Sequence, residues 1–231
     1  MSILIYIVII FMMNRPSSKT LRLFPYLSDK TKLNQLKIDK ESIHYITVRE
    51  YSNKIAEIIM DHLKRINITE NIVVTDCTAG VGGDTLTFGR FFSKIYAIEI
   101  NKLRSEYLQN NIKLYDLKNI TVTNDNCMNI IPFISDHNVI YVDPPWEPNG
   151  IGSYKNYSKL TLPFCEMQLE NFCNKMFDSS YMKCVPSLVV LKLPKNYDMT
   201  HFYNNIHNKH VYYYDLGKMI ILVLLNNNIV I

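Results

Sequence analysis

The sequence predicts an α/β protein with a mainly parallel sheet of seven strands, helices on both faces, and a final antiparallel strand pair. Three observations lead to this prediction. Short β-branched runs alternate with segments of helical periodicity, which favours a parallel sheet covered on both faces. A glycine-rich turn joins the first of these runs to a helical segment. The composition, 48% hydrophobic and 20% charged over 231 residues, is typical of a globular chain with a sizeable core.

The elements follow in chain order. Apolar side chains at helical spacing predict a helix over residues 51–65. A strand at 72–76, a helix at 84–92, a strand at 95–99 and a helix at 102–115 come next, followed by strands at 120–123 and 139–143. We expect a helix over 163–177, a fifth strand over 188–193, a helix over 200–207, and a closing strand pair over 211–214 and 219–225.

Two N-terminal segments precede this pattern, so the expected organisation is 1–13, 14–40 and a main domain over 41–231. The apolar run 3–13 is shorter than the roughly 20 residues of a membrane-spanning helix, and it lacks the flanks of a signal peptide. Three readings stay open: sequence upstream of a start at Met12 or Met13, an element packed on the body, or a membrane-associating segment. The basic arm 14–40 is read either as a solvated face or as a lobe that helps to hold a phosphorylated substrate.

Charge and cysteine usage narrow the class of protein. The formal charge of +4 is compatible with a polyanionic partner without demanding one. The five cysteines form no C-x-x-C pair, which favours neither a zinc site nor a disulfide framework and indicates a reducing compartment.

The glycine-rich turn indicates a binding site. Residues 76–85 (DCTAGVGGDT) lie between the first strand and its helix, where a doubly wound sheet binds nucleotide-like ligands. Gly80 and Gly82 allow the backbone to approach a ligand closely. Glu99 ends the next strand, where a carboxylate can accept hydrogen bonds from ribose hydroxyls. Asp125 follows the third strand, and it either contacts the ligand or caps the following helix.

A second motif, Asp143-Pro144-Pro145-Trp146, ends the fourth strand at the same expected sheet edge. The prolines stop the strand and stiffen the backbone. The carboxylate and the Pro144 carbonyl can accept hydrogen bonds from an exocyclic amine, and an indole can stack on a base. The sequence therefore predicts a site for a flat, amine-bearing base.

These two motifs resemble those of known enzymes. The acid-led glycine motif is similar to the first motif of Rossmann-like, class I S-adenosylmethionine-dependent methyltransferases, and D-P-P-W resembles the catalytic motif of methyltransferases that act on base amines. In order, 42–57, 76–85, 96–99, 143–146 and 193–196 resemble the trimethylguanosine synthase family, the RNA cap guanine-N2 methyltransferases. The resemblance covers about 42–225 and makes 41–231 a methyltransferase catalytic domain. There are three departures: Arg49 stands where the family has Pro, Lys195 stands where it has Arg, and Glu147-Pro148-Asn149 delays the glycines that follow the tryptophan.

The resemblance implies residue roles. The expected catalytic residues are Asp143, Pro144, Pro145 and Trp146. Substrate contacts are expected from Trp146, Tyr154, Lys195 and Asn196. The residues expected to bind S-adenosylmethionine are Thr47, Asp76, Thr78, Gly80, Gly82, Thr85, Glu99, Asp125 and Asn126. Orientation and electrostatics would drive a direct in-line transfer, and whether Asp143 also takes the released proton is left open.

The expected activity is methyl transfer from S-adenosylmethionine to N2 of the 7-methylguanosine cap of RNA. Two alternatives remain: methylation of adenine N6 or of internal guanine N2 in nucleic acid, and a non-catalytic cap- or nucleic-acid-binding module. We expect capped RNA as the partner, no metal, no stable membrane partner and a monomer. The expected compartment is the cytoplasm, with the nucleus or a viral replication compartment as alternatives.

Overall fold

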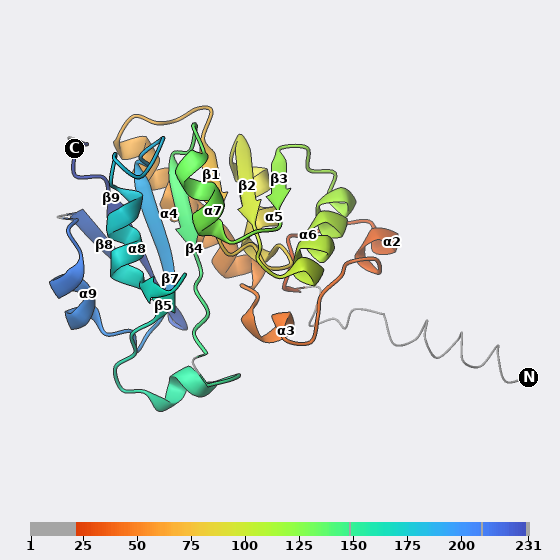
Figure 1. Ribbon diagram of the computed structural model, residues 1–231. Coiled ribbons are helices and arrows are strands. Elements are labelled where there is room, and N and C mark those ends of the chain that lie inside the picture. Colours follow the sequence, from red (N-terminus) through yellow and green to blue (C-terminus); the bar gives the residue numbers. More distant parts are fainter. Residues whose placement is uncertain (1–21, 148, 209, 230–231) are drawn as a thin grey trace, which may run out of the picture.

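The computed structural model describes residues 22–147, 149–208 and 210–229 (Figure 1). The apolar segment 3–13 and the start of the basic arm therefore lie outside the described residues. Within these ranges, no helix is both long and apolar enough to cross a bilayer.

One seven-stranded sheet organises the chain, in the order β3-β2-β1-β4-β7-β9-β8 (Figure 1). Its strands are β1 (Val73–Asp76), β2 (Lys94–Ile98), β3 (Ile120–Thr123), β4 (Val139–Val142), β7 (Leu188–Pro194), β8 (His210–Asp215) and β9 (Met219–Leu225). The pairs β1–β2, β2–β3, β1–β4 and β4–β7 are parallel, whereas β9 runs antiparallel to both β7 and β8. The predicted fold class is confirmed.

The sheet separates two hydrophobic cores because successive side chains of a strand point to opposite faces. On one face, Val139 and Tyr141 of β4 pack with α4 (Arg49–Arg65), α5 (Gly83–Phe91) and α6 (Lys102–Leu114). On the other face, Ile140 and Val142 pack with α7 (Cys127–Ile130), α8 (Leu169–Met176) and α9 (Met199–Asn205). Burial on both faces explains why these strands read as nearly continuous apolar runs.

The N-terminal part begins with α2 (Lys30–Leu33) and α3 (Ser42–Tyr45). Leu23 and Phe24, from the basic arm, are buried in the core that contains α4. The phenol of Tyr115 donates a hydrogen bond to the carbonyl of Pro25 at 2.6 Å. The described part of the arm thus packs on the face of the sheet that α4, α5 and α6 cover.

The predicted helix over 163–177 is wrong in its first half. Two short strands, β5 (Pro163–Phe164) and β6 (Met167–Gln168), form a hairpin before α8 begins. Cys165 and Glu166 between them have φ angles of 50° and 63°. A two-residue turn with both φ angles positive matches the twist of a hairpin, and this local conformation overrides the helical spacing of the apolar side chains.

Candidate active site

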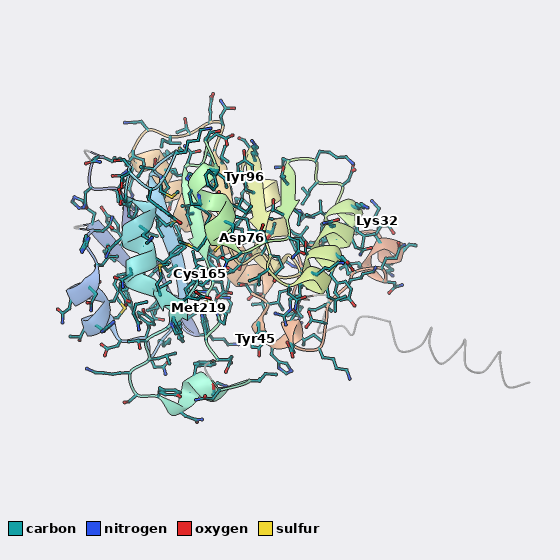
Figure 2. The ribbon with its side chains drawn as sticks, viewed as in Figure 1. Lys32, Tyr45, Asp76, Tyr96, Cys165 and Met219 are labelled. Atoms are coloured by element: carbon teal, nitrogen blue, oxygen red, sulfur yellow. The ribbon has the colours of Figure 1, made fainter. Side chains whose placement is uncertain are left out.

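The site lies at the carboxyl ends of β1, β2 and β4, where a cavity of about 710 Å³ opens. This volume is in the range of small-molecule and cofactor sites, roughly 300–1,000 Å³. Both sequence motifs contribute to its lining, together with α3 and the β5–β6 turn. Asp76, Tyr45 and Cys165, labelled in Figure 2, come from three different segments that line this one cavity.

The glycine turn is shaped by Asp76. Its Oδ1 accepts a hydrogen bond from the Thr78 amide at 3.1 Å, and its Oδ2 accepts one from the Thr85 hydroxyl at 2.6 Å. Burial raises the pKa of Asp76 to about 7, and repulsion from Asp84 and Asp143 adds to the rise. The hydrogen bonds from Thr85 and Thr78 lower the pKa and so oppose it. Thr78 lines the cavity and Thr85 does not, so Thr85 supports the turn from behind.

The two glycines of the turn that were predicted to approach the ligand have different surroundings. The amide of Gly80, which lines the cavity, donates to Glu99 Oε2 at 2.7 Å and so ties the turn to the end of β2. Gly82 is not in the lining; its φ is 105°, and a Cβ there would stand 2.8 Å from Cδ1 of Leu108. Close packing on α6 thus accounts for Gly82.

Glu99, Asp125 and Asn126 all line the cavity. Glu99 Oε1 also accepts the Asn101 amide at 2.8 Å, which fixes the carboxylate at the mouth of the turn. Asn126, not Asp125, is the N-cap of α7, and its side chain accepts a hydrogen bond from the Met128 amide at 3.0 Å.

The Asp143-Pro144-Pro145-Trp146 motif faces the same cavity. The amide of Asp143 donates to the Thr78 hydroxyl at 2.8 Å, which joins the second motif to the first. The indole N–H of Trp146 donates to the carbonyl of Lys192 at 3.2 Å. Tyr154 lines the cavity with its ring 5.6 Å from that of Trp146 at an interplanar angle of 75°.

Lys192, which sequence reasoning missed, lies in β7, between β4 and β9 in the sheet. Its side chain is only 3% exposed, and its Nζ lies 2.5 Å from Asp143 Oδ2 and 2.8 Å from Thr47 Oγ1. The Thr47 hydroxyl donates to Asp84 Oδ2 at 2.6 Å, and the Tyr141 hydroxyl donates to the same oxygen at 2.9 Å. The sequence did offer a signal for Lys192, because it is the one lysine in the otherwise apolar run 188–194. A lysine is rarely buried unless a partner neutralises its charge, so its presence in a buried strand indicates such a partner.

Lys195 and Asn196 are not brought into the cavity. Lys195 is half exposed and pairs with Asp215 at 2.9 Å. The Asn196 amide donates to the carbonyls of Tyr154 and Tyr157 at 2.8 and 2.7 Å. Asn196 thus holds the loop that contains Tyr154. Its neighbour in sequence, Lys195, lies at the surface.

The cavity is acidic although the whole chain carries a formal charge of +4. Among the described lining residues, the lysine and arginine side chains are Arg104 and Lys192. The acidic ones are Glu41, Asp76, Asp84, Glu99, Asp125, Asp143, Glu147 and Glu166. Such a lining favours a cationic ligand, because unlike charges attract strongly where water is scarce. The described residues hold no group of three or more His, Cys, Asp or Glu side chains placed to bind a metal ion.

Solved structures share this fold at low sequence identity. A 16S rRNA N2 methyltransferase of T. thermophilus, in complex with AdoMet and guanosine, superimposes with a TM-score of 0.55 at 14% identity, covering 82% of this chain and 44% of that one. A methyltransferase candidate from Porphyromonas gingivalis gives a TM-score of 0.59 at 15% identity, covering 96% and 58%. These similarities support the class I methyltransferase fold.

Sequence comparison identifies the family. An uncharacterized protein of Acanthamoeba polyphaga mimivirus is 34% identical over 220 residues, which cover 87% of this chain and 83% of that protein. A family model described as RNA cap guanine-N2 methyltransferase matches residues 70–228. That match spans both motifs and most of the sheet. The chain therefore belongs to the RNA cap guanine-N2 methyltransferase family and has the fold of class I S-adenosylmethionine-dependent methyltransferases.

Proposed function

We propose that the protein transfers a methyl group from S-adenosylmethionine to N2 of the 7-methylguanosine cap of RNA. The observation that carries this proposal is the single acidic cavity in which Asp143 and Trp146 lie beside Asp76 and Glu99. S-adenosylmethionine-dependent methylation is the chemistry of the family and the fold. The cap substrate is inferred from the description of the family, and the acidic lining and Trp146 of the cavity are compatible with it.

The cavity fits the cofactor by the chemistry of its donors and acceptors. In this proposal Glu99, which follows β2, accepts hydrogen bonds from ribose hydroxyls, and Asp125 and Asn126, which also line the cavity, contact the adenine ring. We assign Asp76, Thr78, Gly80 and Thr47, which line the same cavity, to the remaining, methionine-bearing part. When bound, S-adenosylmethionine supplies a cationic sulfonium methyl group.

The acceptor side is built to orient a weakly nucleophilic amine. Asp143 Oδ2 is held by Lys192, and Oδ1 accepts no hydrogen bond from the described residues. Oδ1 and the Pro144 carbonyl can accept the two N–H groups of a base amine and so aim its nitrogen at the methyl group. Methyl transfer would form an N–C bond as the C–S bond of the cofactor breaks, and Asp143 Oδ1, which would already accept the amine, would be an acceptor for the proton that leaves the nitrogen.

A methylated cap guanine is favoured over an ordinary guanine by charge. 7-Methylguanine is cationic, and Trp146 offers an indole face within the acidic lining. A cation over a desolvated indole gains about 2 kcal/mol. Glu147, the acid that departs from the family pattern, also lines the cavity and adds to its negative charge.

The test uses the full chain with methyl-labelled S-adenosylmethionine. The acceptors are m7GTP, m7G-capped RNA, GTP and an uncapped oligonucleotide that contains adenine and guanine. We expect label in both m7G acceptors, located at N2 by mass spectrometry, and little in GTP. Transfer to the uncapped oligonucleotide alone would establish the adenine-N6 or internal guanine-N2 alternative. Tight m7G binding without cofactor binding or transfer would establish a binding module.

A further inference from the structure

We propose that Lys192 is a positioning residue of the methyl transfer, whose buried ammonium group fixes the Asp143 carboxylate so that one oxygen stays free for the acceptor amine. This inference rests on the proposed function only for the identity of the acceptor. Any reaction in which Asp143 orients a base amine would need the same support.

The position of Lys192 in the sheet requires partners for its charge. All seven residues of β7 are buried, and Lys192 is the charged one among them. A buried ammonium group is strongly disfavoured unless it is paired and hydrogen-bonded. Lys192 meets this requirement with two side-chain oxygens, Asp143 Oδ2 and Thr47 Oγ1, and with the Trp146 ring 5.2 Å away.

The hydrogen bonds in this group all have a defined direction. The ammonium donates to Thr47, and the Thr47 hydroxyl, having accepted, donates to Asp84. Tyr141 donates to the same oxygen of Asp84. Residues from β4, α5, β7 and the segment before α4 therefore hold the ammonium in one place, and the ammonium in turn holds Asp143.

Lys192 also connects the two halves of the acceptor site. Its Nζ holds Asp143, while its backbone carbonyl accepts the indole N–H of Trp146. Replacing the side chain removes the first contact and leaves the second donor–acceptor pair intact. A side-chain variant thus removes the ammonium from Asp143 and from the Trp146 ring, and keeps the backbone carbonyl that accepts the indole N–H.

The charge of Lys192 has a second consequence, for protonation. Burial raises the pKa of Asp143 to about 6, and attraction to Lys192 is the main influence that opposes the rise. The other groups that face Asp143 are Asp84 from α5 and Asp76 from β1, which repel its charge, and the Tyr141 hydroxyl from β4. Without the ammonium, the pKa of Asp143 rises above 6, so the carboxylate that should accept the amine is protonated near neutral pH.

The experiment compares Lys192→Met, Lys192→Arg and the wild type. Lys94→Met is the matched control, because Lys94 pairs with Asp136 at 2.9 Å on the surface at the start of β2. For Lys192→Met we expect kcat to fall about 10- to 100-fold. In the pH profile of kcat, the acidic limb should move up by about one pH unit or more. The Kd for S-adenosylmethionine should change little. Lys192→Arg should restore the position of the limb, and Lys94→Met should resemble the wild type.

A titration that needs no turnover separates this proposal from the proposed function. Carbon-13 NMR follows the aspartate carboxyls of the full chain as the pH is varied, and Asp143→Asn assigns the Asp143 signal. The midpoint of this titration gives the pKa of Asp143 without any turnover. We expect about 6 in the wild type and an upward shift in Lys192→Met. An unshifted midpoint, or a folded Lys192→Met with wild-type kcat and pH profile, overturns the role of Lys192. If Lys192→Met fails to fold, a wild-type midpoint well above 6 overturns it. A shifted midpoint in a protein that does not methylate m7G overturns the cap proposal alone.

Discussion

Removing the Trp146 ring is the most direct test of the acceptor site. Trp146 is half-buried, with Tyr154 against its edge and the Lys192 ammonium on the ring at 5.2 Å from its centroid. We expect a bound 7-methylguanine to use the indole surface that these neighbours leave toward the cavity. The change Trp146→Ala deletes this surface and leaves the backbone of β7 in place.

The expected loss follows from one stacked base. Base–aromatic stacking contributes about 1–3 kcal/mol per base, which corresponds to a roughly 5- to 150-fold weaker Kd for m7GTP. The upper part of this range applies because the base is cationic and the cavity acidic. Glu99, Asp125 and Asp76 are unchanged, so the Kd for S-adenosylmethionine should stay within about 3-fold of wild type, roughly 0.6 kcal/mol.

The assay is isothermal titration of the full chain with m7GTP and, separately, with S-adenosylmethionine. Trp146→Phe keeps an aromatic face and should recover part of the m7GTP affinity. Tyr203→Ala, at an exposed side chain of α9, is the control for a surface aromatic. Equal m7GTP affinity in Trp146→Ala and wild type would refute the stacking role, and a parallel loss of both ligands would indicate general damage to the cavity.

Four further outcomes are expected. Asp143→Ala should abolish detectable turnover while S-adenosylmethionine still binds by titration calorimetry; near-normal turnover would contradict its role. Glu99→Ala should weaken that binding by about 1.5–3 kcal/mol, since it removes a charged hydrogen-bond acceptor, with m7GTP affinity as the internal control. Because the pKa of Asp76 is raised to about 7 and its ionised form attracts the cationic cofactor, affinity should rise with pH toward 7 and level off above it. Conversely, the Asp76 contribution to the stability of the free protein is lost as pH rises from about 4 to 7, because the unfolded chain ionises first; Asp76→Asn should flatten both profiles. Gly82→Ala should lower the free energy of unfolding by about 1–3 kcal/mol, measured in urea, and by more than Gly217→Ala, which has a positive φ but no neighbour within 4 Å of its Cβ.

The sequence allowed good prediction of the strands because each is a short apolar run. The strand 120–123 and the last strand 219–225 match the structure at both ends. The order of the last two strands could not be read in this way, since β9 inserts between β7 and β8 through contacts distant in sequence. The turn at Cys165 and Glu166 was missed for a related reason: its two positive φ angles belong to residues that rarely adopt them.

The candidate site divides in the same way. Gly80, Glu99 and Asp143 were predicted to lie together, because motif residues that follow parallel strands gather at one sheet edge, and all three line the cavity. Lys195 was predicted from its place in a motif, yet the structure pairs it with Asp215 outside the cavity. Lys192, three residues earlier, was passed over as part of a strand.

What the sequence by itself determined is the set of local features: the strands, the two motifs, and the edge at which they meet. These depend on periodicity and on residue types at short spacing. Only the tertiary structure decided which charges face one another. Lys192, Thr47, Asp84 and Asp143 lie on different elements, up to 145 residues apart, and a buried ammonium is stable only where folding brings such partners to it.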